Sequence, residues 1–162
     1  MIIGVDCGKN KVHAVCSDGS AFSHEVKSGT PRDVSLQELR KTFLNFIGYQ
    51  EVWTPKGKSL RLYVEAPVVA GARNIQSTIG IAETVGMVLS LGYPATLVAI
   101  STWKKVVVGK GNATKEEVAE WYERTGGSLR GQDFYDSSAI CAYGVKDMEV
   151  AEHLRGGSLS AD

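Results

Sequence analysis

The pattern of apolar and polar residues at the start of the chain predicts three antiparallel strands. Residues 2–6 form a short, β-branched apolar run that ends in a turn, which is typical of a buried strand. Apolar and polar side chains alternate over residues 12–16, and the Asp18-Gly19 pair favours a tight turn into a strand over residues 21–27. We therefore expect a meander of three strands.

The rest of the chain alternates helical and strand patterns. Ser35 and Thr114 each stand three residues before a glutamate, a capping-box sequence that marks a helix start. We expect helices over residues 36–47, 74–91, 115–124 and 134–146, a loop over residues 48–59, and strands over residues 60–65 and 95–100. Helices between strands make those strands parallel, which predicts an α/β fold with a mixed five-stranded sheet, antiparallel at its start and parallel afterwards, flanked by helices. This is expected to be one domain over residues 1–154 with a flexible tail over residues 155–162.

Composition and charge narrow the class of protein. With 162 residues, 43% of them hydrophobic, the chain is long enough for one domain with a core, which excludes collagen-like, disordered and disulfide-scaffold proteins. Lysine plus arginine number 18 and aspartate plus glutamate number 18, so only local clusters of charge indicate a partner. The three cysteines form no C-x-x-C pair and no apolar run is long enough for a membrane span. We expect a cytoplasmic protein with reduced thiols and no membrane contact.

Four carboxylates occupy positions that core packing alone does not favour. Asp6 and Glu65 each end an apolar strand, and Asp133 and Asp136 share one face of the first turn of the last helix. Four acids that converge would repel unless they take up protons or bind a cation, and oxygen ligands favour Mg²⁺ or Mn²⁺. Two such ions activate a water and stabilise the leaving oxygen of a phosphodiester. The alternatives are a turn residue at Asp6, a helix cap at Asp133 and a solvated helix residue at Asp136.

A basic, glycine-containing segment lies between the fifth strand and the next helix. Residues 101–115 carry four lysines, while Gly109 and Gly111 allow a close approach of the backbone to a phosphate. The spacing is not that of a P-loop. Together with the acids, the segment favours a DNA backbone that runs past a metal site, with a solvated loop as the alternative.

Four motifs in this order resemble the RuvC family of Holliday-junction resolvases, in the ribonuclease H-like superfamily. They are Ile3-Gly4-Val5-Asp6-Cys7-Gly8, Val64-Glu65, the V-V-G-x-G-x-A-x-K pattern within residues 104–115, and Asp133-Phe134-Tyr135-Asp136-Ser137-Ser138-Ala139. The resemblance covers the chain up to about residue 147 and implies a ribonuclease H-like fold. It also implies a Mg²⁺-dependent crossover junction endodeoxyribonuclease of DNA recombination and repair, with Mn²⁺ able to substitute. Paired symmetric nicks in a four-way junction imply a homodimer.

The resemblance also implies roles for particular residues. The four acids would bind two metal ions, and Lys104 and Lys115 would contact the cleaved strand or support charge on its phosphate. The expected catalytic residues are Asp6, Glu65, Asp133, Asp136 and Lys115. The expected DNA contacts are Lys104, Lys105, Gly109, Lys110, Gly111, Lys115 and Arg73.

The chain also departs from the family. Members of the family wedge an aromatic residue into the junction shortly after the glutamate, where this sequence has Pro67, Val68 and Val69. Wedging would then fall to Tyr63, Trp103 or another residue. The polar stretch over residues 49–59 is longer than expected, as in divergent viral members, which suggests a bacteriophage source.

The sequence is also compatible with other functions. The same fold could act on RNA, flaps or replication forks, or bind branched DNA without cutting it. The first strand also resembles the phosphate-binding strand of actin-like kinases and ATPases, which need two such domains. His13, His24 and His153 lack ligand spacing and are expected at the surface or in strands, Trp53 is expected in a loop, and the helix over residues 74–91 is a candidate dimer contact.

Overall fold

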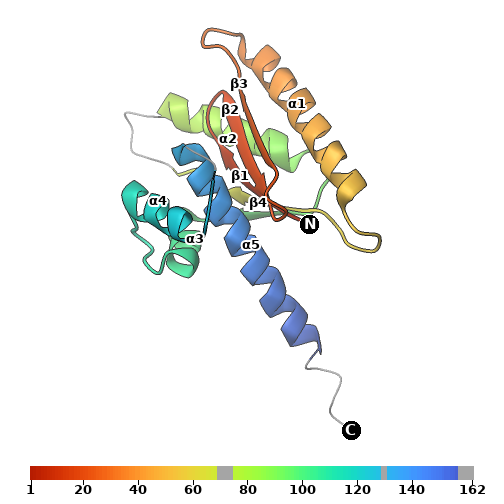
Figure 1. The fold of residues 1–162 in the computed structure, drawn as a ribbon. Coiled ribbons are helices and arrows are strands. Elements are labelled where there is room, and N and C mark those ends of the chain that lie inside the picture. The colour runs from red at the N-terminus through yellow and green to blue at the C-terminus, as the bar shows by residue number, and fades with distance from the viewer. Residues whose placement is uncertain (69–74, 129–130, 157–162) are drawn as a thin grey trace.

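A mixed sheet of five strands forms the centre of the protein, with helices on both faces (Figure 1). The computed structural model describes residues 1–68, 75–128 and 131–156. The sheet order is β3-β2-β1-β4-β5. The β1–β2 and β2–β3 pairs are antiparallel and the β1–β4 and β4–β5 pairs are parallel, so the sheet is antiparallel at its start and parallel afterwards, as predicted. The elements are β1 (Ile2–Cys7), β2 (Lys11–Cys16), β3 (Ala21–Glu25), α1 (Arg32–Trp53), β4 (Arg61–Glu65), α2 (Ile75–Leu89), β5 (Ala95–Val98), α3 (Ile100–Val107), α4 (Lys115–Arg124) and α5 (Gln132–Gly156).

The alternation of side chains along the strands builds two apolar layers. On one face of the sheet, alternate strand residues such as Ile3 and Val5 pack against α1 and α2, where Phe43 and Val88 are buried. Ile2 and Tyr63 face the opposite way and pack against α3, α4 and α5. Every residue with the parity of Ile2 on β1 therefore faces α5.

Two glycines allow α5 to lie directly on this second face of the sheet. A Cβ at Gly4 would overlap the backbone of Cys141 and the carbonyl of Ser137, so the helix backbone rests on β1 at that point. A Cβ at Gly144 would meet the Tyr63 ring and Ile2. This close packing fixes the first turn of α5 above the end of β1.

The first helix begins earlier and ends later than its sequence pattern predicts. Pro31 precedes its first residue, and Ser35 is buried inside the helix, where its hydroxyl donates to the Pro31 carbonyl at 3.1 Å. The capping box predicted at Ser35 is therefore wrong. The predicted loop over residues 48–59 is wrong in its first half, because α1 continues to Trp53, which ends the helix and is 62% exposed.

The region after β5 holds a helix that the sequence interpretation missed. Ile100, predicted as the end of a strand, begins α3, which buries Trp103 and Val107. Their spacing is helical, but the β-branched run 106–108 obscured it. The box at Thr114 is present as predicted, with Glu117 donating its backbone N–H to the Thr114 hydroxyl at 3.3 Å.

The last helix is longer than predicted and continues ten residues past its expected end at residue 146, to Gly156. Asp147, in this extension, accepts a hydrogen bond from the Tyr63 hydroxyl at 2.8 Å, which ties the helix to β4. Residues 157–162 of the predicted tail lie outside the described residues. All three cysteines are buried and form no disulfide in the described structure, as expected. No helix within the described ranges is long and apolar enough to cross a membrane.

Candidate active site

The register of the central strands brings Asp6 and Glu65 together. Val5 pairs with Val64 across the parallel β1–β4 ladder, so the next residues of the two strands, Asp6 and Glu65, lie side by side. Both have the parity that faces α5, and both are half-buried. Two acids at neighbouring strand ends are therefore held over one face of the sheet.

The first turn of α5 adds the other two acids. Asp133 and Asp136 lie one turn apart near the start of the helix, and both act electrostatically on Asp6. Gln132 donates a hydrogen bond to Asp136 at 3.1 Å. The structure thus brings all four predicted acids into one region.

Burial and mutual repulsion disfavour the charged forms of these acids. Burial, with the charges of Glu65, Asp136 and Asp133, raises the pKa of Asp6 from 3.8 to about 7. Burial, opposed by a hydrogen bond from Trp103, raises the pKa of Glu65 from 4.5 to about 7, and burial also raises the pKa of Asp136. Buried carboxylates that repel one another favour the binding of a cation, because its positive charge offsets their repulsion.

Basic and aromatic groups from α3 and α4 border the acids. The Trp103 indole donates to Glu65 at 3.0 Å, and the Lys104 ammonium donates to the Ala113 carbonyl at 2.5 Å. The charges of Lys104 and Lys115 both lower the pKa of Asp136, which burial raises. The two lysines singled out by the sequence therefore lie near the acids.

Two residues of β2 belong to the same region and were missed by the sequence interpretation. The Lys11 ammonium contacts Asp133 at 2.8 Å, and the His13 Nε2 atom lies 3.2 Å from the same carboxylate. His13 was expected at the surface or in a strand; it lies in β2, where it pairs with Asp6 and is buried. Burial lowers the pKa of His13, which leaves Lys11 as the cation beside Asp133.

The donor set suits a hard divalent ion, since it consists of carboxylate oxygens. A pocket of about 220 Å³ opens at Asp6 and Glu65 and is lined further by Pro67, Val68 and Ile100. Within the described ranges, however, no three Asp, Glu, His or Cys side chains are arranged closely enough to hold a metal ion. Asp133 contributes to this, because its carboxylate faces Lys11 and His13.

The predicted DNA contacts Lys105, Gly109, Lys110 and Gly111 lie at the end of α3 and in the turn that follows it. Gly109 has a φ of 97°, which a residue with a side chain rarely adopts, and a Cβ at Gly111 would approach the Ser101 carbonyl to 3.1 Å. Lys105 is exposed, and Lys110 forms an ion pair with Glu117 at 2.5 Å. Arg73 lies outside the described residues.

The aromatic residues suggested as junction wedges are not available to DNA. Tyr63 and Trp103 are each 1% exposed, because both pack between the sheet and the helices of the second face. The suggestion that either stacks on a junction is therefore wrong. Val68, in the stretch where the resemblance led us to expect a wedge, is 54% exposed, and Val69 lies outside the described residues.

The fold is similar to that of solved RuvC structures. The Thermus thermophilus RuvC structure superimposes with a TM-score of 0.63 at 17% sequence identity, over 86% of this chain and 90% of that one. The structure of T. thermophilus RuvC in complex with Holliday junction substrate gives the same TM-score at 16% identity, over 86% of this chain and 89% of that one. No family model matches the sequence, and no curated protein matches it. The comparisons thus show a RuvC-like fold.

Proposed function

We propose that this protein is a divalent-metal-dependent endodeoxyribonuclease that resolves four-way DNA junctions by paired nicks. The observation that carries the proposal is the placement of Asp6 and Glu65 side by side under the first turn of α5, where both pKa values rise to about 7. The likeness to a RuvC structure in complex with Holliday junction substrate supports branched DNA as the substrate.

The residues of the chain divide into three roles in this proposal. Asp6, Glu65, Asp133 and Asp136 would hold Mg²⁺, which supplies an activated water and charge stabilisation at the phosphate. Trp103 orients Glu65 through its indole N–H. Lys104 and Lys115 place positive charge beside the acids, where it would favour the anionic phosphate and its transition state.

Paired nicking requires two copies of the site, so we propose a homodimer. The exposed apolar residues of α2 are suitable for the contact, since Ile75 is 50% exposed and Ile79 46% exposed. Val68 is also exposed, at 54%, and lines the pocket at Asp6. Sedimentation of the wild type and of Ile79→Glu tests the assignment, because a buried charge should convert the dimer to a monomer.

The proposal is tested by nicking of a synthetic four-way junction, mapped at nucleotide resolution with Mg²⁺ and with EDTA. The wild type should cut opposed strands symmetrically only with Mg²⁺, and Asp6→Asn should bind the junction without cutting it. Asp18→Asn is the matched control, because it removes the same charge at an exposed turn at the other end of β2. Cutting by Asp6→Asn would refute the assignment. Competition with a duplex, a flap and an RNA hairpin identifies the preferred substrate.

One observation favours a second function, a junction-binding protein that does not cut. Asp133 faces Lys11 and His13, and no three potential ligands in the described part of the chain are arranged to hold a metal. Junction binding without nicks in either Mg²⁺ or Mn²⁺ would support this function over the nuclease.

A further inference from the structure

Lys11 lies where it can control the position of Asp133, one of the four acids of the site. It has the same parity on β2 as His13, which pairs with Asp6, so its side chain lies on the face of the sheet covered by α5. Its ammonium contacts the Asp133 carboxylate at 2.8 Å. The side chains of Lys11 and Asp133 are 32% and 39% exposed, so the ion pair lies at the rim of the site.

The backbone before Lys11 holds its side chain in this direction. A Cβ at Gly8 would come within 2.5 Å of the Lys11 Cγ and 2.9 Å of its Cε, so the stem of the lysine lies against the glycine. The Gly8 N–H also donates to the Lys11 carbonyl at 2.9 Å, which closes the turn between β1 and β2. The turn therefore directs Lys11 toward Asp133.

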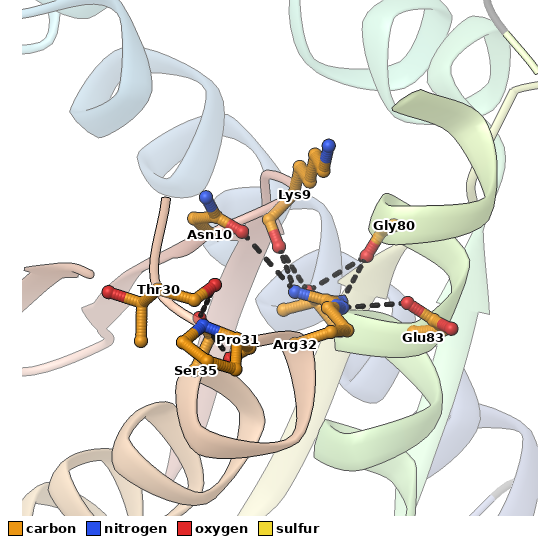
Figure 2. A network of polar contacts seen from close by, with 9 residues as sticks. Lys9, Asn10, Thr30, Pro31, Arg32, Ser35, Gly80 and Glu83 are labelled. Carbon is orange, nitrogen blue, oxygen red and sulfur yellow. Dashed lines mark hydrogen bonds and ion pairs between the residues drawn. The ribbon is translucent and has the colours of Figure 1, made fainter. Parts of the chain in front are cut away.

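Arg32 fixes the same turn from the other side (Figure 2). Its guanidinium donates to the Lys9 carbonyl and to the Asn10 side chain in the turn, and it forms an ion pair with Glu83 of α2 at 2.7 Å. It also donates to the Gly80 carbonyl at 2.5 Å. Because α1, α2 and the turn meet at one guanidinium, the position of Lys11 is set by the fold.

We propose that Lys11 is the positioning residue of Asp133. Its ammonium holds the Asp133 carboxylate on the β2 side of the site until a divalent cation takes the place of the ammonium. The Asp133 carboxylate is accordingly directed toward Lys11 and His13 of β2. In this role Lys11 competes with the cation for one ligand and lowers the affinity of the site. The inference rests on the proposed metal-dependent function and adds a control on metal loading.

The test is calorimetric titration of the DNA-free protein with Mn²⁺. Lys11→Met should bind Mn²⁺ about fivefold more tightly than the wild type, the effect of an ion pair worth about 1 kcal/mol at 1.36 kcal/mol per tenfold change. Lys11→Arg keeps the charge and should restore wild-type affinity. In an Asp133→Asn background, Lys11→Met should change the affinity less than twofold, because the group that Lys11 holds is gone.

Lys104→Met is the matched control for a general effect of charge. Lys104 influences Glu65 and Asp136 but contacts the Ala113 carbonyl, so its removal should alter Mn²⁺ affinity equally with and without Asp133→Asn. Unchanged affinity in Lys11→Met, or the same tightening in the Asp133→Asn background, overturns the role of Lys11. Absence of Mn²⁺ binding by the wild type overturns the metal site and this inference with it. Mn²⁺ binding that Asp6→Asn abolishes and Lys11→Met leaves unchanged overturns the inference alone.

Discussion

Replacement of Asp6 by asparagine should stabilise the metal-free protein at high pH. Folding raises the pKa of Asp6 from 3.8 to about 7, so the folded state binds this proton more tightly than the unfolded state does. Between these values the stability of the wild type falls as pH rises, and the full penalty is present above pH 7. Asparagine has the same size and carries no charge, so it removes the penalty.

The size of the expected gain in stability follows from the pKa shift of Asp6. A rise of about three units corresponds to about 4 kcal/mol as an upper limit at 1.36 kcal/mol per unit. Asparagine still has to be buried as a polar group, so the expected gain in free energy of unfolding is about 2 kcal/mol at pH 8. At pH 5 the gain should be less than half of that, because most of the penalty develops as pH rises further.

Urea unfolding in EDTA at pH 5 and pH 8, followed by circular dichroism, measures both values. Asp18→Asn is the control and should change stability little at either pH, since Asp18 is exposed. Saturating Mg²⁺ should make the wild type more stable than Asp6→Asn at pH 8, because it stabilises the wild type and not the variant. Loss of stability in Asp6→Asn at pH 8, or an equal gain at both pH values, would refute the account of a buried, repelled charge.

Three further substitutions test the packing and polar contacts around the site. Gly4→Ala should lower the free energy of unfolding by about 3 kcal/mol, because the new methyl group overlaps the α5 backbone. Gly86→Ala in α2 is the control. Its methyl group meets nothing within 4 Å, so it should be neutral or stabilising in the same urea experiment. Trp103→Phe removes the donor to Glu65, so the pH midpoint of Mn²⁺ binding, measured by calorimetry, should move upward. Thr114→Ala should lower the free energy of unfolding by about 1 kcal/mol, because it removes the capping box of α4.

Each of these substitutions has an outcome that contradicts its reasoning. Equal stability of Gly4→Ala and Gly86→Ala would show that α5 does not rest on β1. An unchanged pH midpoint in Trp103→Phe would show that the indole does not favour the charged form of Glu65. Unchanged unfolding of Thr114→Ala would show that the cap is dispensable.

The acids could be predicted because they break the apolar pattern of their own elements. Asp6 and Glu65 each end an apolar strand, and Asp133 and Asp136 begin a helix, so position alone marks them. The meander at the start and the helices between the later strands predicted a sheet that is antiparallel first and parallel afterwards, and the structure has such a sheet. Local patterns were sufficient for these features.

Lys11 and His13 depend on information that a local pattern does not contain. Only the antiparallel register places His13 opposite Asp6, and only the packing of α5 brings Asp133 to Lys11. Their shared parity on β2 was the available signal, since residues 11 and 13 both face α5 once β1 and β2 are paired. The missed start of α1 has a similar cause, because Arg32 is held by contacts with distant segments.

The central claim is that carboxylates from β1, β4 and α5 share one divalent metal site. Diffraction from crystals grown with Mn²⁺, recorded where manganese scatters anomalously, tests it directly. We expect anomalous peaks between Asp6, Glu65 and Asp136, with Asp133 turned away from Lys11 toward them. Manganese bound elsewhere, or no peak at Asp6 under saturating Mn²⁺, would contradict it.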